Sequence, residues 1–224
     1  MSGLLMKDFY LIMANKKMYA VFALIAICFA SIGKGESATM AVTYFTMILG
    51  MSVLSTITYD EYDHSIVHLM TLPIQRKDYA IEKCVFSFIS LLCSWMIGLT
   101  MITATLWIKG VAIEWNSWLL SNMTILFIMS LLVAIMIPIQ IKFGGENGKM
   151  VVIGVILVTF MVAFGISQLL VYLKIDLEAI FHHIERLMTE TNVVLLVSVG
   201  LMGMVSIFVL SGLISYRIVR KKEY

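Results

Sequence analysis

Six long stretches of the chain contain neither a charged residue nor a histidine, and they determine its predicted architecture. They lie at 18–32, 38–57, 84–108, 118–141, 150–173 and 193–216. A helix formed by such a stretch is apolar on every side, and about 20 apolar residues cross a bilayer core about 30 Å thick. The pattern predicts an all-α integral membrane protein with six transmembrane helices, in a single transmembrane domain that covers residues 1–224.

The first stretch is the shortest of the six. Lys17 and Lys34 flank it, and a helix between them is about 25 Å long at a rise of about 1.5 Å per residue. The two lysine side chains can reach opposite membrane interfaces and so make up the missing length. The alternative is a cleaved signal peptide, because Cys28-Phe29-Ala30 has the small-x-small pattern of a cleavage site.

Two of the connecting segments mix apolar and charged residues. Residues 1–17 place Leu4 and Phe9 beside Lys7 and Asp8, which predicts a helix in the membrane interface, with a frayed tail as the alternative. Residues 176–190 repeat apolar positions at helical spacing beside a charged face. They predict an amphipathic helix on the outer membrane surface.

The longest charged connection is 58–83. Its centre, Ile66-Val67-His68-Leu69-Met70, predicts a short helix with an apolar side, which ends before Pro73. Residues on both sides of this centre are strongly charged, which indicates a loop that faces water.

The distribution of lysine and arginine predicts the orientation. Of the 16 such residues, only Lys34, Lys109, Lys174 and Arg186 fall on the side opposite to the N-terminus if six helices span the membrane. Cytoplasmic loops carry the excess of positive residues. Both termini are therefore predicted to be cytoplasmic.

Composition supports a membrane location. Hydrophobic residues make up 61% of the chain and charged residues 13%, against about 45–50% and about 25% in soluble domains. A water-soluble fold of this size cannot bury so much apolar surface. The 3 cysteines are isolated within apolar runs, which indicates neither a disulfide framework nor a metal site.

The candidate motifs for catalysis, metal binding and nucleotide binding each lack the residues or the spacing that their chemistry requires. Gly144–Lys149 resembles a phosphate loop, but it is one residue short and Met150 follows where Ser or Thr is required, so it predicts a flexible turn. His64 and His68 have ligand spacing on a helix, but no zinc or calcium pattern accompanies them. The predicted spans lack the ionisable groups of membrane proteases and ion-driven pumps. The sequence thus predicts no catalytic residue, no metal and no bound cofactor.

Three short motifs resemble the permease subunits of bacterial type-2 ABC transporters. They are the start Leu4-Leu5-Met6-Lys7-Asp8-Phe9, the acidic run Asp60-Glu61-Tyr62-Asp63, and Leu72-Pro73-Ile74-Gln75-Arg76-Lys77 before the third span. The resemblance extends to the layout of the whole chain, with an interfacial N-terminal helix, six spans and an outer segment between the last two. It implies a multi-pass protein of the bacterial cytoplasmic membrane.

This resemblance implies a coupling helix in the 58–83 loop, which docks on a separate cytosolic ABC ATPase. The residues expected at this contact are Asp60, Glu61, Tyr62, Asp63, His64, Leu72, Pro73 and Arg76. ATP and Mg²⁺ are expected on that ATPase and not on this chain, so the chain is not itself an enzyme. The other expected partners are a second permease subunit, identical or a sister chain, and the lipid bilayer; no nucleic-acid partner is expected.

The resemblance also implies a substrate path lined by the second and fifth spans. On this chain the path would include Thr43, Tyr44, Met47, Thr159, Phe160 and Gln168. Small permeases of this type in Firmicutes are similar to exporters of amphipathic peptides such as phenol-soluble modulins or bacteriocins, which a weakly charged path would suit. Two other functions stay open at this point: a non-transporting membrane scaffold or immunity protein, and a membrane-embedded enzyme.

Overall fold

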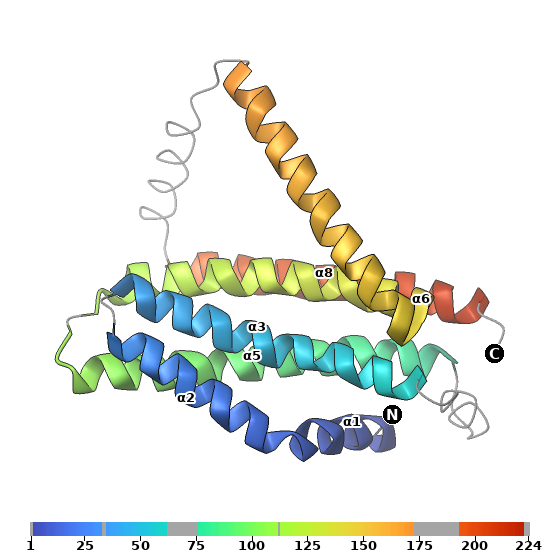
Figure 1. Cartoon of the computed structure of the whole chain (residues 1–224), viewed down its shortest axis with the longest axis horizontal. Coiled ribbons are helices and arrows are strands. Elements are labelled where there is room, and N and C mark those ends of the chain that lie inside the picture. Colours follow the sequence, from blue (N-terminus) through green and yellow to red (C-terminus); the bar gives the residue numbers. More distant parts are fainter. Residues whose placement is uncertain (1, 33–34, 62–75, 112, 173–192, 222–224) are drawn as a thin grey trace.

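The computed structural model describes residues 2–32, 35–61, 76–111, 113–172 and 193–221, and the regular structure in these ranges is helical throughout. The helices are α1 (Ser2–Ala14), α2 (Lys16–Ile32), α3 (Gly35–Glu61), α5 (Arg76–Ile108), α6 (Trp115–Tyr172) and α8 (Val193–Lys221). Most of them run side by side along the long axis of the molecule (Figure 1). The all-α prediction is confirmed for these residues.

Helix α3 lies at the centre of the bundle. It packs against α1, α2, α5 and α6, and α8 packs against both α5 and α6. The core is mainly aliphatic, with aromatic side chains such as Phe45 and Trp95 among it, and its fully buried side chains include Val42, Ile57, Leu91, Ile102 and Ile137. Since the helices are apolar all round, contact with a neighbouring helix alone decides which face is buried, and the other faces stay exposed.

The turn between α5 and α6 joins two helix ends. Gly110 has a positive φ of 67°, its N–H donates to the Trp107 carbonyl, and the N–H of Val111 donates to the Leu106 carbonyl. These two bonds form a Schellman cap that satisfies the last carbonyls of α5. Lys109 from this turn donates to the Ala30 and Ser31 carbonyls, so it also caps α2.

Helix α6 is broken at Gly144, where φ is 81° and ψ is 174°. Its first half packs in the bundle, whereas its second half leaves it at a steep angle (Figure 1). The run 144–149 was predicted to be a flexible turn; the structure corrects this, because only Gly144 departs from helical geometry. The left-handed φ of that residue suits glycine, which has no Cβ.

Four described helices are long and apolar enough to cross a membrane: Ser37–Asp60, Lys77–Ile108, Trp115–Gly144 and Val197–Lys221. A fifth is possible if Gly3–Ala14 and Lys16–Ile32, which meet at a 62° bend, count as one span. The chain is therefore a multi-pass membrane protein, and the predicted count of six goes beyond these helices. The predicted fifth span, 150–173, falls mainly in the second half of α6, and the predicted outer helix, 176–190, lies outside the described residues.

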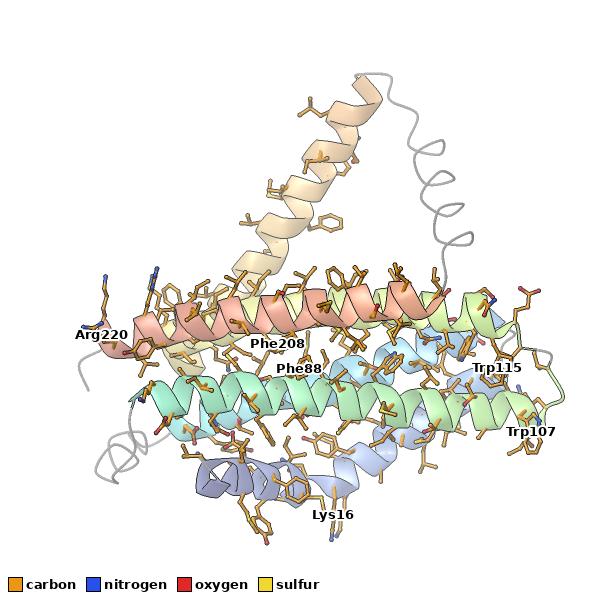
Figure 2. The ribbon with its side chains drawn as sticks, turned by 180° about the vertical axis from the view of Figure 1, so that it is seen from behind. Lys16, Phe88, Trp107, Trp115, Phe208 and Arg220 are labelled. Carbon is orange, nitrogen blue, oxygen red and sulfur yellow. The ribbon has the colours of Figure 1, made fainter. Side chains whose placement is uncertain are left out.

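The two ends of the bundle differ in chemistry. The N-terminus, the C-terminal end of α8 and the helix ends that flank residues 62–75 lie at one end (Figure 1). Trp107 and Trp115, which are 81% and 60% exposed, lie at the other end (Figure 2). Exposed tryptophans commonly mark a membrane–water interface.

Close approach of α3 to α5 yields a first test. A Cβ added at Gly98 would lie 3.0 Å from Cδ1 of Phe45. Gly98→Val should therefore push the two helices apart and lower the free energy of unfolding by about 1–3 kcal/mol. Reversible unfolding of the purified protein in mixed micelles with increasing SDS measures this change.

Gly200→Val is the matched control, because no atom of a neighbouring helix lies within 4 Å of a Cβ at that helical position. It should leave the unfolding free energy close to that of the wild-type chain. An equal loss in both variants would contradict close packing at Gly98.

Candidate functional site

A buried cluster of charged side chains joins three helices near residues 62–75. Lys83 of α5 is its centre: its Nζ lies 2.7 Å from Oδ2 of Asp60 in α3 and 2.5 Å from Oδ2 of Asp8 in α1. The side chains of Lys83 and Asp8 are fully buried, and that of Asp60 is 4% exposed. We call the group formed by Lys7, Asp8, Asp60, Glu82 and Lys83 the charge cluster.

Hydroxyl groups complete the network around this lysine. Lys83 donates to Oγ1 of Thr56 at 3.2 Å, and Thr56 donates to Oδ2 of Asp8 at 3.1 Å. Tyr79 donates its hydroxyl to Oδ2 of Asp60 at 3.3 Å. Lys7 also pairs with Asp60, and its Nζ lies 3.5 Å from Oδ1 of Asp8. A buried charge is tolerated when such partners replace water.

Glu82 is the exception within the charge cluster. It is buried, and neither carboxyl oxygen has a hydrogen-bond partner, although Nζ of Lys83 lies 4.0 Å away. With all five groups ionised, three carboxylates face two ammonium groups. Glu82 is thus the member whose burial is least compensated.

The charge cluster connects the two helix ends that flank residues 62–75. Asp60 is the penultimate residue of α3, and Lys83 lies two turns into α5. A fourth helix is attached nearby, because Nε2 of Gln140 in α6 donates to the Leu54 carbonyl at 3.0 Å and to Oγ1 of Thr58 at 2.6 Å. A displacement of the C-terminal end of α3 would therefore be transmitted to α1, α5 and α6.

Two apolar grooves flank α8. The groove between α5 and α8 has a volume of about 500 Å³, and its walls include Ile81, Phe88, Phe208 and Leu213. The rings of Phe88 and Phe208 meet edge to face at 5.4 Å and mark the middle of this contact (Figure 2). The groove between α6 and α8 has a volume of about 520 Å³.

Comparison with protein families decides what this molecule is. Residues 3–220 match the model of the ABC-2 family transporter proteins. The chain belongs to this family. No curated protein and no solved structure matches it.

Membership of the ABC-2 family makes the chain a membrane subunit of an ABC transporter. Such subunits are generally not catalytic themselves, and the family implies association with an ATPase subunit. The resemblance that the sequence suggested is confirmed at this level.

The structure places the predicted coupling residues unequally. Asp60 is buried in the charge cluster. Glu61 and Arg76 are the terminal residues of α3 and α5. The remaining five lie outside the described residues: Tyr62, Asp63, His64, Leu72 and Pro73. Direct contact of this set with an ATPase stays a prediction.

The predicted path residues are not gathered around the two grooves. Thr43 donates to the Thr39 carbonyl within its own helix, and the ring of Tyr44 meets that of Phe22 in α2 at 6.4 Å. Met47 is 40% exposed on α3. Phe160 and Gln168 are exposed on the second half of α6, where Thr159 also lies. A path through these six residues stays a prediction.

Sequence reasoning missed the central member of the charge cluster. Asp8 and Lys83 fall in or beside family-like motifs, yet neither was predicted as a site residue. The available signal was three charged side chains, Asp8, Asp60 and Lys83, each close to the same predicted membrane boundary. Their pairing depends on how the helices pack.

Removing the central cation should destabilise the protein strongly. In Lys83→Met, Asp8 and Asp60 keep their burial but lose their shared partner, so unfolding should become easier by about 3–5 kcal/mol. Unfolding in SDS measures the difference. Lys77→Met, which removes an exposed cation from the same helix, should have little effect.

Glu82→Gln should behave in the opposite way. It removes a buried carboxylate that accepts no hydrogen bond, while the two short ion pairs of Lys83 stay intact. The unfolding free energy should equal or exceed that of the wild-type chain in the same titration. A loss as large as that of Lys83→Met would show that Glu82 supports the charge cluster.

Proposed function

We propose that the chain is the permease subunit of an ATP-driven ABC exporter, which receives force from its ATPase through residues 58–83. The observation that carries this proposal is the ion pair between Asp60 and Lys83, at 2.7 Å, because it joins α3 and α5, the two helices that flank the segment expected to dock on the ATPase. If the two helices that flank the contact loop could slide apart, a movement of the ATPase would displace the loop without moving the helix bundle. An ion pair between these helices holds them together.

Asp60 then acts on coupling through position and not through contact. Its carboxylate is occupied by Lys7 and Lys83, so its proposed role is to hold the end of α3 against α1 and α5. The residues expected to touch the ATPase are those beyond it, between Glu61 and Arg76. ATP and Mg²⁺ bind the ATPase in this proposal, and this chain carries no catalytic group.

We further propose six spans with both termini in the cytoplasm. Helix α2 supplies the first span, with α1 as the interfacial helix before it, and the two halves of α6 supply the fourth and fifth. The second half of α6 exposes large apolar side chains such as Phe160, at 71%, and Met161, at 72%. Lipid, or a second permease subunit, would have to cover them, and this supports assembly with an identical or sister chain.

The proposed cargo is an amphipathic peptide, such as a cytolytic or antimicrobial peptide. The apolar groove between α5 and α8 and the absence of charged residues within the predicted spans support an amphipathic peptide over a sugar or an ion. Export places the cargo on the side of Trp107 and Trp115.

Reconstitution with the ATPase that copurifies with the chain tests the proposal. Arg76→Glu reverses a charge at the expected contact and lies outside the charge cluster. It should reduce both copurification and ATP-dependent transport of a fluorescent amphipathic peptide by about tenfold, since one interfacial charge contact contributes roughly 1–2 kcal/mol. Transport into inverted vesicles measures the second quantity.

Lys16→Glu is the matched control, because Lys16 is an exposed cation at the α1–α2 bend, on the opposite side of the bundle from α8 (Figure 2). It should leave both quantities unchanged. If Arg76→Glu bound the ATPase and transported as well as the control did, force transfer through this segment would be refuted. A stable chain that never captured an ATPase would favour a non-transporting scaffold.

A further inference from the structure

Beside the C-terminal end of α8, the α6–α8 groove continues into a wider hollow. The groove is walled by aliphatic side chains, including Leu131 and Ile135 of α6 and Leu210 of α8. This hollow has a volume of about 810 Å³, and the described residues that line it are Lys142, Ile214, Arg217, Ile218, Arg220 and Lys221. Lys142, Ile214 and Ile218 line both, so the two form one continuous depression.

Two helices bring the cations of this hollow together. On α8, Ile214, Arg217, Ile218 and Lys221 follow the i, i+3, i+4, i+7 spacing of one helical face. Lys142 comes from α6, two residues before the break at Gly144, and its Nζ lies 5.0 Å from the centre of the Phe143 ring. The second half of α6 leaves the bundle at Gly144, directly after Lys142 and Phe143 (Figure 1).

General rules explain only part of this arrangement. Basic residues are common at the cytoplasmic ends of membrane helices and favourable at helix C-termini. These rules require cations near the end of α8, but they do not require Lys142 of another helix to converge on the same hollow. None of the described residues that line the hollow is acidic. Lys142, Arg217 and Lys221, at the mouth of an apolar groove, match a ligand with an anionic head and a hydrocarbon tail.

We propose that this depression binds an anionic glycerophospholipid, with its phosphate among Lys142, Arg217 and Lys221 and one acyl chain in the α6–α8 groove. The site rests on the membrane placement given under the proposed function, because its cations lie at the end of the bundle opposite to Trp107 and Trp115 (Figure 2). Guanidinium groups bind phosphate oxygens through paired hydrogen bonds, and basic pockets between membrane helices suit such headgroups.

Native mass spectrometry of the full chain in detergent micelles tests the proposal. Phosphatidylcholine, phosphatidylglycerol and cardiolipin are offered at equal concentrations, and soluble glycerol 3-phosphate is offered separately. The chain should retain cardiolipin and phosphatidylglycerol at least about tenfold better than phosphatidylcholine, because each cation near an anionic headgroup contributes severalfold in affinity. Equal retention of the three lipids, or equal affinity for glycerol 3-phosphate, would overturn the proposal.

Two kinds of variant separate the headgroup site from the acyl groove. Lys142→Gln/Arg217→Gln should remove the preference for anionic lipid, whereas Lys16→Gln/Lys17→Gln, which loses the same charge on the far side of the bundle, should keep it. Leu210→Trp, which fills the groove without a change in charge, should lower retention of every lipid. Normal retention in Leu210→Trp would overturn the acyl assignment, and so would cross-linking that shows a second copy of the chain in the groove.

This experiment contains no ATPase, so its outcome is independent of the coupling test. Loss of lipid selectivity in the control pair would show a general surface charge effect and refute the site, while the transport result of Arg76→Glu would be untouched.

Discussion

The ion pair between Lys83 and Asp60, shared with Asp8, is the interaction on which this end of the molecule depends. Three helices each contribute one charged side chain to a place that water does not reach, so none of the three can move away without leaving a charge uncompensated. Apolar packing between membrane helices is weakly directional, because lipid solvates the same surfaces. The charge cluster therefore supplies positional specificity that leucines and valines could not.

Whereas the charge cluster holds helices together, the break at Gly144 separates the second half of α6 from the bundle. It ends the packed part of α6 and sends the remaining helix outward, with its large apolar side chains exposed. Lys142, two residues before this break, lines a hollow together with the basic end of α8. One left-handed residue thus creates, next to the depression assigned to an anionic lipid, a surface that requires lipid or another subunit.

The sequence predicted the helices that an uninterrupted apolar stretch defines. It did not predict which charged side chains form ion pairs with each other. The stretches 38–57, 84–108 and 118–141 were recognisable because no charge interrupts them, and helices enclose all three. Asp60 was noticed as one charge in an acidic run, but Lys83 was not identified as its partner, since 23 positions separate them. Asp8 lies farther still from Lys83, and only the packing of α1 brings them within 2.5 Å.

The sequence by itself determined that the chain is helical, apolar and multi-pass, because a chain of 224 residues cannot bury several uncharged helices of about 20 residues within itself, whereas lipid can cover them. It also indicated the family, because the short motifs that carry the resemblance can be recognised without knowing which residues are in contact. Only the tertiary structure decided which charges meet at Lys83, where α6 breaks, and that cations from two helices converge at the end of one groove. These features depend on helix rotation and packing, and a helix that is apolar on every side carries no periodic signal that fixes either.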